Sequence, residues 1–330
     1  MSNARRPASP LISILVPAYN EERNLDRLYE RLTSALAPLN GRFRFEILLL
    51  DNCSEDRTRE VAHAIVARDP RWRYVRYSRN FGYHGSLTAG LDLAAGDAVA
   101  IQVADMQDPP EVLPKLIEVW WSGADVAYGV VRKRSDSSLI KTFGAKVVYW
   151  LIHRVSDTGI PPSATDFRVL DRRVVSVLLA MREPDRYLRG MVHWIGFTQT
   201  AVEYDRKPRT EGASTFGLWD SLLMSAHAII CFSVVPLRLM AWFGLAVVAG
   251  SVTLAAVFTG IYLFRPAGVP VPQPGITLVV VLLLFTLGLN AVFLGVIGEY
   301  IGRIYNQGKE RPLYIIAETL NFPSDTQART

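Results

Sequence analysis

Apolar and polar positions alternate in blocks along the first half of the chain. Four short segments rich in apolar residues have the length of strands, at residues 11–16, 45–50, 72–77 and 98–103. The segments between them repeat apolar side chains at helical spacing, as in Leu25, Leu28, Leu32 and Leu36. Strands that alternate with helices of this length predict βαβ units and therefore an α/β domain with a mostly parallel sheet.

The apolar pattern changes beyond residue 238. Residues 239–264 and 276–298 carry no charge, and a helix needs about 20 apolar residues to cross a bilayer. The Pro- and Gly-rich segment 266–275 lies between them, which predicts a hairpin of two transmembrane helices (about 239–264 and 276–300). Two buried core helices are the alternative. The preceding residues 216–235 mix aromatic and polar side chains, which predicts amphipathic helices in the membrane interface.

The basic residues around this hairpin predict its orientation. Before it lie Arg206, Lys207, Arg209 and Arg238, and after it Arg303, Lys309 and Arg311, whereas the loop holds only Arg265. The positive-inside rule then keeps both ends in the cytoplasm. The expected parts of the chain are a disordered N-terminus (1–10), an α/β domain (11–215), interfacial helices (216–235), a membrane segment (236–305) and a cytoplasmic tail (306–330).

Composition and charge narrow the class of protein. The 330 residues carry a net charge of +5 and contain two cysteines, Cys53 and Cys231. We expect no nucleic-acid partner, because the chain shows neither an arginine-rich arm nor zinc-ligand spacing. The mild positive charge fits either ordinary solubility or attraction to an anionic membrane surface. Two distant cysteines predict a reduced, cytosolic setting, and residues 1–10 do not resemble a signal peptide.

Polar side chains gather where the predicted strands end. They are Tyr19, Asn20 and Glu21, then Asp51, Asn52 and Ser54, then Arg79 and Asn80, then Asp105. Open parallel sheets bind ligands at this edge, and such hydroxyl, amide and carboxylate groups suit the base and ribose of a nucleotide. Two ordinary interpretations stay open: Asn20 and Glu21 as a helix cap, and Asp51 to Ser54 as a turn.

The stretch from Val103 to Glu111 adds a possible cation site. Asp105 and Gln107 follow the fourth predicted strand and precede a helix predicted from Pro110 to about residue 121. A carboxylate and an amide two residues apart can offer oxygen ligands to a hard divalent cation, and such a cation can hold a diphosphate. An Asp-Pro-Pro turn without a ligand is the alternative.

In this order, the segments PAYNEE, DNCSEDRT, SRNFGYHGSLTAG and ADMQDPPE resemble the family 2 glycosyltransferases of the GT-A fold. Within that family the chain is similar to the polyprenyl-phosphate glycosyltransferases, the group that includes the bactoprenol glucosyl transferases and dolichol-phosphate mannose synthase. The resemblance covers about residues 11–315. It implies a GT-A (Rossmann-like) domain on the cytoplasmic face of the cell inner membrane, anchored by a multi-pass segment with both termini cytoplasmic.

The implied reaction is the inverting transfer of a sugar from a nucleoside-diphosphate sugar to a polyprenyl (undecaprenyl) phosphate. The product would be a lipid-linked monosaccharide for modification of cell-envelope glycans. The expected partners are a UDP-sugar rather than a GDP-sugar, the polyprenyl phosphate, the lipid bilayer and further copies of the chain in a homo-oligomer. The expected cofactor is Mg²⁺ or Mn²⁺.

The resemblance also implies roles for individual residues. Nucleotide binding falls to Pro17, Tyr19, Glu21, Asp51, Asn52, Ser54, Arg79 and Asp105. The metal ligands would be Asp105 and Gln107, and Arg209 would bind the diphosphate. Arg132, Arg134 and Lys141 would receive the acceptor phosphate, although a solvated basic face is the alternative. Asp166 matches the position of the family's proposed catalytic base; the alternative is a loop residue that caps a helix starting near Asp171.

The chemistry of the acceptor limits the role of a base at Asp166. The second pKa of a phosphate monoester is about 6, so the nucleophile is mostly ionised at neutral pH. Removal of a proton then contributes less than the usual ~10²–10⁴-fold of general base catalysis. We therefore expect Asp166 mainly to orient the acceptor phosphate or a cation. His84, in the third polar segment, is expected to be a surface histidine.

Two residues depart from the family pattern. Asn52 stands where the family has the second of two aspartates, and Val103 stands at the first aspartate of the Asp-x-Asp motif. These departures motivate an alternative function, a degenerate nucleotide-sugar-binding membrane scaffold without catalysis. A processive polysaccharide synthase is a third alternative, but it would typically carry a Gln-x-x-Arg-Trp motif, which we do not find.

Overall fold

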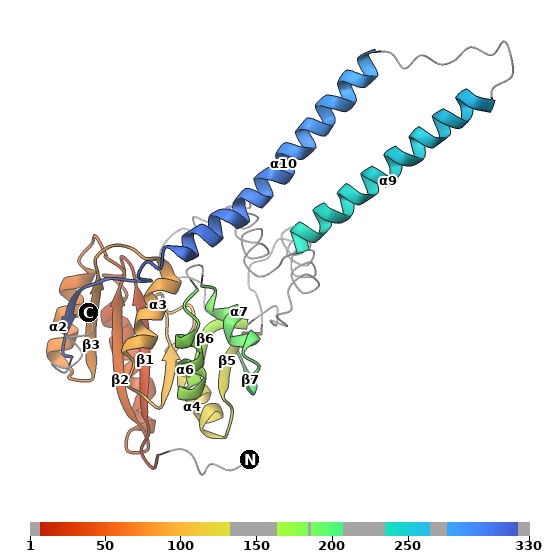
Figure 1. The fold of residues 1–330 in the computed structure, drawn as a ribbon. Helices are drawn as coiled ribbons and strands as arrows, with labels where there is room; N and C mark the ends of the chain where they lie inside the picture. The colour runs from red at the N-terminus through yellow and green to blue at the C-terminus, as the bar shows by residue number, and fades with distance from the viewer. Residues whose placement is uncertain (1–6, 133–163, 184–185, 207–234, 265–275, 323–330) are drawn as a thin grey trace. The chain divides into compact units, whose positions relative to one another are not determined.

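The computed structural model describes residues 7–132, 164–183, 186–206, 235–264 and 276–322. Expected features in the other segments lie outside the described residues; most of the expected interfacial helices, 216–235, are among them. The chain divides into two compact units, one formed by residues 1–218 with 311–330 and the other by residues 219–310. We describe each unit by itself (Figure 1).

The first unit is built on one sheet of eight strands in the order β7-β5-β6-β4-β1-β2-β3-β8. The strands span Leu11–Ala18 (β1), Arg44–Asp51 (β2), Trp72–Tyr77 (β3), Ala98–Ile101 (β4), Val126–Val131 (β5), Ala164–Asp171 (β6), Gln199–Tyr204 (β7) and Ile316–Leu320 (β8). The β1–β2, β1–β4, β2–β3 and β5–β7 pairs are parallel, whereas β6 and β8 run antiparallel to their neighbours. The expected mostly parallel α/β sheet is confirmed.

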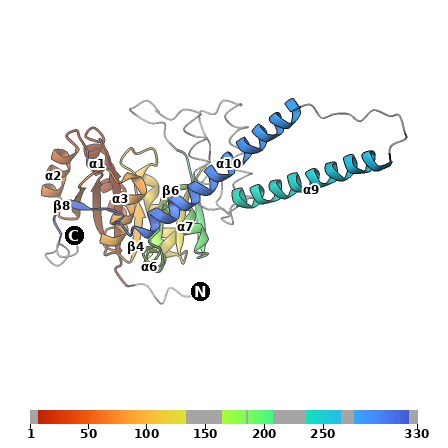
Figure 2. The ribbon, with the colours of Figure 1, turned by 45° about the horizontal axis from the view of Figure 1, so that its top comes forward.

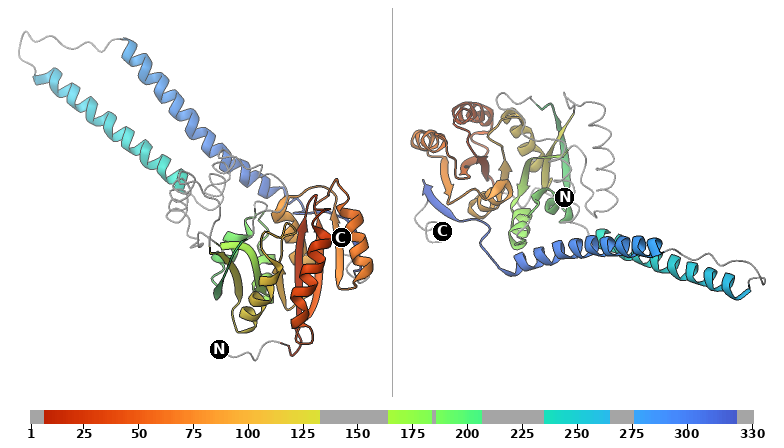
Figure 3. Two further views of the ribbon diagram at one scale, coloured as in Figure 1. Left: turned by 180° about the vertical axis from the view of Figure 1, so that it is seen from behind. Right: turned by 90° about the horizontal axis from the view of Figure 1, so that it is seen from above.

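Helices cover both faces of this sheet (Figure 3). Their bounds are Leu25–Leu36 (α1), Thr58–Arg68 (α2), Gly82–Leu93 (α3), Leu113–Trp121 (α4), Arg172–Ala180 (α6) and Leu188–Trp194 (α7), with 3-10 turns at Ala37–Leu39 (η1) and Pro110–Val112 (η2). Side chains of α1, α2 and α4 belong to one buried cluster, and those of α3, α6 and α7 belong to another. The domain therefore has three layers, helices–sheet–helices.

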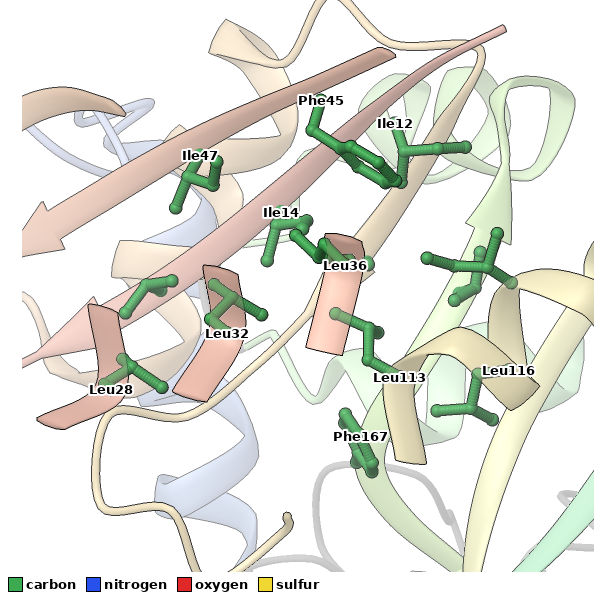
Figure 4. Close-up of a cluster of buried hydrophobic side chains, with 14 of the residues drawn as sticks. Ile12, Ile14, Leu28, Leu32, Leu36, Phe45, Ile47, Leu113, Leu116 and Phe167 are labelled. Atoms are coloured by element: carbon green, nitrogen blue, oxygen red, sulfur yellow. The ribbon is translucent and has the colours of Figure 1, made fainter. Parts of the chain in front are cut away.

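The leucine pattern of α1 explains how one layer is held. Leu28, Leu32 and Leu36 point at the strands and pack with Ile12 and Ile14 of β1 (Figure 4). These side chains are no more than 1% exposed, and full burial of such a side chain contributes roughly 1.5–3 kcal/mol. The periodicity thus fixes which face of α1 meets the sheet.

The C-terminal strand β8 was not predicted from the sequence. It pairs antiparallel with β3, so the end of the chain forms one edge of the sheet (Figure 2). Asn321 donates its Nδ2 hydrogens to the carbonyls of Pro70 and Trp72, at 2.9 and 2.8 Å. Residues 316–322, expected within a cytoplasmic tail, are therefore part of the α/β domain.

The second unit contains two long helices, α9 (Val235–Phe264) and α10 (Ile276–Gly308). The rings of Phe243 and Phe293 make an edge-to-face contact with centroids 6.4 Å apart. Within the part of the chain that the structure describes, one helical segment, Phe285–Gly308, has the length and apolar composition needed to cross a membrane. The expected hairpin of two transmembrane helices is therefore not confirmed, although each expected span lies in a helix.

Candidate active site

The topology of the sheet brings the expected site residues to one edge. Strands β1 to β4 run parallel, so the loops that follow them lie on the same side. Strand β6 is antiparallel to β4 and β5, which places its first residues at that same edge, together with the loops after β5 and β7. We call this edge the carboxyl rim; in an open α/β sheet it is where ligands bind.

Three residues with left-handed backbone conformations mark the carboxyl rim. They are Asn20 after β1 (φ 55°), Cys53 after β2 (φ 63°) and Met106 after β4 (φ 52°). A positive φ is uncommon for residues other than glycine, and such strain concentrates at functional sites. Each of these residues lies in a loop that follows a strand, at the edge where a ligand would lie.

The loops after β1 and β2 are joined by hydrogen bonds. The amide N–H of Asn20 donates to Ser54 Oγ at 3.0 Å, and Asn20 Oδ1 accepts from the Glu55 N–H at 2.9 Å. The Glu21 N–H donates to Thr58 Oγ1 at 2.8 Å. Asn20 and Glu21 do not cap α1, which begins at Leu25. Their contacts instead hold the loops after β1 and β2 together.

Asp51 is fully buried, and both of its oxygens have partners. Oδ1 accepts from the Ser54 N–H at 2.8 Å, which confirms the turn interpretation. Oδ2 accepts from Tyr74 Oη at 2.6 Å and from Arg76 Nη1 at 3.1 Å. Asp51 therefore organises the loop after β2 from beneath.

Asn52 connects the loop after β2 to the loop after β3. Its Nδ2 donates to Asn80 Oδ1 at 2.8 Å, and its Oδ1 accepts from the Phe81 N–H at 2.9 Å. Asn52 is 6% exposed, and both polar atoms of its amide have partners within the protein.

The other expected nucleotide-binding residues differ in exposure. Tyr19 is 43% exposed and Arg79 is exposed, whereas Pro17 is buried.

The expected metal ligands follow β4. Asp105 and Gln107 are both half-buried, and the Gln107 N–H donates to Asp105 Oδ1 at 3.1 Å across the left-handed Met106. No group of three or more His, Cys, Asp or Glu side chains able to hold a metal occurs among the described residues. One carboxylate and one amide oxygen still fit Mg²⁺, which commonly keeps several waters and takes further oxygens from a substrate phosphate.

Asp108 is a further carboxylate at this edge. Its position after the fourth predicted strand places it there, although it was not among the expected site residues. It is 3% exposed, accepts a short hydrogen bond from Tyr204 Oη, and pairs with Arg206 Nε at 3.0 Å. Burial raises its pKa, and Arg206 and Tyr204 counteract that rise. Arg206 lies three residues before Arg209, the expected diphosphate-binding residue, and its ion pair with Asp108 fixes the end of the described stretch 186–206.

Asp166 lies inside strand β6 and does not cap a helix. The cap of α6 is Asp171, whose side chain accepts from the Arg173 N–H, so the alternative for Asp166 is wrong. Arg189 of α7 donates from Nε to Oδ1 at 3.1 Å and from Nη2 to Oδ2 at 2.7 Å. Arg168 Nη2 lies 3.3 Å from Oδ1. Burial raises the pKa of Asp166, but Arg189 and Arg168 outweigh it and hold the pKa below its usual value.

His84 is not the expected surface histidine. It lies in the first turn of α3, is half-buried, and makes ring contacts with Tyr83 at 5.4 Å and Tyr187 at 5.8 Å. Burial lowers its pKa, so the imidazole is neutral at physiological pH. A histidine after a Gly-Tyr pair gave no periodic signal that would have revealed this burial.

The expected acceptor and diphosphate residues are described only in part. Arg134, Lys141 and Arg209 lie outside the described residues. Arg132 follows β5, is exposed, and pairs through Nε with Glu203 Oε2 at 3.2 Å. Arg132 therefore lies at the carboxyl rim, as does Asp166 at the start of β6.

Comparison with known proteins gives consistent matches. The family profile described as Glycosyl transferase family 2 matches residues 13–178. An uncharacterised glycosyltransferase of Synechocystis sp. is 36% identical over 307 residues, which cover 93% of this chain and 95% of that protein. The bactoprenol glucosyl transferase of Shigella phage SfV is 37% identical over 311 residues, which cover 92% of this chain and 97% of that protein.

Among solved structures, the glucosyl-3-phosphoglycerate synthase from Mycobacterium tuberculosis, in complex with Mn²⁺, UDP and glucosyl-3-phosphoglycerate, is similar to this chain. The match has a TM-score of 0.43 and 19% sequence identity, and it covers 68% of this chain and 78% of that one.

Proposed function

The chain belongs to glycosyl transferase family 2, and from that premise we propose that it transfers a sugar from a nucleoside-diphosphate sugar to a polyprenyl phosphate. The family membership confirms the resemblance found in the sequence and makes the protein a glycosyltransferase. Similarity to a bactoprenol glucosyl transferase over 92% of the chain supports the lipid phosphate as acceptor. UDP-sugar is our proposed donor, and undecaprenyl phosphate our proposed acceptor.

The observation that carries this proposal is the joint placement of donor-side and acceptor-side groups on the carboxyl rim. Tyr19, Arg79 and Asp105 follow parallel strands there. Asp166 and Arg132 reach the same edge from β6 and β5. A nucleotide-sugar at the first group would therefore lie beside a phosphate received by the second. Bound and oriented in this way, the two reactants gain much of the rate that proximity supplies.

We propose a direct displacement with inversion. An oxygen of the lipid phosphate forms a bond to the anomeric carbon, the bond from that carbon to the diphosphate breaks, and the nucleoside diphosphate leaves with the electron pair. Asp105 and Gln107 would hold Mg²⁺ or Mn²⁺, which would offset the negative charge of the leaving diphosphate. Arg209 would add positive charge there. Asp166 would orient the acceptor, with Arg132, Arg134 and Lys141 around its phosphate.

The two departures from the family pattern are compatible with this function. The Asn52 side chain holds the loops after β2 and β3 together, because its amide donates one hydrogen bond and accepts another. Val103 leaves Asp105 as the carboxylate of the metal motif, which suffices for Mg²⁺ when the diphosphate supplies further oxygens. The scaffold alternative is therefore not favoured.

We further propose that α9 and α10 form a transmembrane hairpin. This would anchor the enzyme in the cell inner membrane with the α/β domain and both termini in the cytoplasm. The uncharged stretches 239–264 and 276–298 support two spans, and the basic residues outside them support this orientation. A water-soluble donor and a membrane-bound acceptor can then meet at the membrane face. A homo-oligomer and a role in cell-envelope glycan modification belong to the same proposal.

The deciding experiment is transfer of radiolabel from a panel of UDP- and GDP-sugars to undecaprenyl phosphate by the purified full-length protein. We expect label in extractable lipid from one donor, lost on addition of EDTA and in Asp105→Ala. The exposed Asp26→Ala on α1 is the matched control and should keep activity. Transfer that resists EDTA would refute the metal assignment. Nucleotide binding without transfer from any donor would refute the function and favour the scaffold.

A further inference from the structure

Arg189 and Asp166 form a fork-to-fork ion pair between α7 and β6. Two nitrogens of the guanidinium meet the two oxygens of the carboxylate, Nε to Oδ1 at 3.1 Å and Nη2 to Oδ2 at 2.7 Å. Such bidentate pairs fix the plane of the carboxylate as well as its position. Sequence reasoning gave Arg189 no role, because it lies 23 residues from Asp166 on another element.

The charges around Asp166 come from several elements. From its own strand, Arg168 is 3% exposed and contacts Oδ1. Tyr83 and the neutral His84 of α3 lie within electrostatic reach of Asp166. So does Asp108, in the loop after β4. The two arginines are therefore the positive charges that keep a carboxylate of 20% exposure ionised.

We propose that Arg189 is a positioning residue for the transfer reaction, which acts by holding both oxygens of Asp166 in the orientation that meets the acceptor phosphate or its cation. The inference rests on the proposed function, because it gives Asp166 a reaction to serve. Arg189 acts through Asp166 and is not itself assigned a contact with substrate.

The packing of α7 separates this role from a purely structural one. Leu188, Met191 and Val192 of α7 are each at most 5% exposed, and they belong to the buried cluster that also contains side chains of α3 and α6. Burial of these side chains supplies the attachment of the helix. Replacement of Arg189, which is 28% exposed, should therefore release the Asp166 carboxylate while the domain keeps its fold.

The test compares Arg189→Gln and Arg189→Lys with Arg182→Gln in the full-length enzyme. Arg182 is the matched control, because it also makes a bidentate pair, with Asp92 at 2.8 and 2.7 Å, outside the proposed site. The kcat and the KM values for both substrates are measured from pH 4.0 to 8.5, together with thermal unfolding. In Arg189→Gln we expect kcat to fall at least about 10-fold.

The pH profile gives the readout that a structural role would not move. Loss of one opposite charge raises the pKa of a half-buried carboxyl by about 1 unit or more. Below pH 5, the kcat of Arg189→Gln should therefore fall more steeply than that of wild type, beyond the fall that protonation of the acceptor phosphate causes in both enzymes. Arg189→Lys, which keeps a charge but not the fork, should lower kcat with a smaller change below pH 5. The KM for the nucleotide-sugar should stay within about 2-fold of wild type, and Arg182→Gln should match wild type.

Four outcomes would count against these claims. A wild-type kcat and pH profile in Arg189→Gln would overturn the inference. So would a lower kcat with an unchanged pH profile and a lower unfolding temperature, because that combination marks a structural role. If Arg189→Gln does not fold, a wild-type kcat in Arg189→Lys would overturn the inference instead. No transfer by the wild-type enzyme would overturn the proposed function, and the inference with it.

Discussion

Asn52 and Asn80 join the loops after β2 and β3 by one amide–amide hydrogen bond of 2.8 Å. Asn80 Oδ1 also accepts from the Gly82 N–H at 2.8 Å, while Asn52 Oδ1 accepts from the Phe81 N–H at 2.9 Å. Residue 52 must therefore donate one hydrogen bond and accept another. An amide can do both, whereas an ionised carboxylate only accepts. Asn52, which stands where the family has an aspartate, therefore has a physical role in this chain: it joins the loops after β2 and β3.

We expect Asn52→Asp to weaken both the fold and donor binding. A carboxylate at residue 52 would face the acceptor oxygen of Asn80 in a site where Asn52 is 6% exposed, and a lost buried hydrogen bond costs about 1–3 kcal/mol. The KM for the nucleotide-sugar should rise several-fold with a smaller change in kcat. Steady-state kinetics and urea unfolding measure the two effects.

The control for this substitution is Asn40→Asp, an exposed position that follows η1 and lies four residues before β2 begins. It changes the charge in the same way without touching the carboxyl rim. Equal KM values in the two variants would contradict the role assigned to the Asn52–Asn80 bond.

Much of the fold follows from local pattern. The strand β3 was predicted at its observed bounds, Trp72–Tyr77, because a segment of strand length rich in aromatic residues lies between two helical patterns. The predicted strand 98–103 ends earlier, at Ile101, since the chain must turn before Asp105. The polar rim was also predictable, because parallel strands present their carboxyl ends at one edge.

The contacts that complete the site depend on residues distant in sequence. Asn52 and Asn80 are 28 residues apart, and Asp108 and Tyr204 are 96 apart. No periodicity links such pairs, so their pairing emerges only when the sheet order is known. Strand β8 was missed for a similar reason: its five residues pair with β3, far earlier in the chain, and carry no hairpin signal.

His193 should make the domain less stable in weak acid. Burial, aided by Arg168 and Arg189, lowers the pKa of His193 to about 4, whereas an unfolded histidine has a pKa of about 6.5. Between these values the unfolded state binds a proton that the folded state does not, so stability falls as pH decreases from about 6.5 towards 4. Because His193 is only half-buried, we expect about 0.5–1 kcal/mol at pH 5.5.

The substitution His193→Phe tests this linkage, since it keeps a ring against Tyr128, whose centroid is 5.9 Å away. Its loss of stability between pH 7.5 and 5.5 should be smaller than that of wild type. The control is Tyr128→Phe, which changes the same ring pair but leaves His193 in place as the titrating group. If His193→Phe and wild type lose equal stability over this interval, the linkage is wrong.

Removal of residues 311–330 should destabilise the α/β domain and expose β3. Strand β8 covers the β3 edge, Asn321 binds two backbone carbonyls, and Tyr314 Oη donates to Asp92 at 2.9 Å. An uncovered edge strand is a template for aggregation. Thermal unfolding should show a melting temperature lower by at least about 5 °C. Size-exclusion chromatography in detergent should show larger species.

Removal of residues 323–330 alone should change neither the melting temperature nor the size of the species. Equal behaviour of the two truncations would refute a structural role for β8.

Tyr204→Phe should destabilise the domain more at neutral pH than in acid. Burial already raises the pKa of Asp108, and the Tyr204 hydroxyl is one of two groups that oppose this rise. Without that hydroxyl the folded pKa rises further, so the ionised carboxylate costs more; this cost appears as pH increases above the unfolded pKa of about 3.9. We expect the free energy of unfolding of Tyr204→Phe to be lower by about 1–3 kcal/mol at pH 7 and by less at pH 4.5. Urea unfolding monitored through tryptophan fluorescence measures both values.

The control is Tyr29→Phe, which removes a hydroxyl from half-buried Tyr29 on α1 and should show no such pH dependence. A loss in Tyr204→Phe that is equal at both pH values would mean that the hydroxyl supports packing rather than the Asp108 carboxylate.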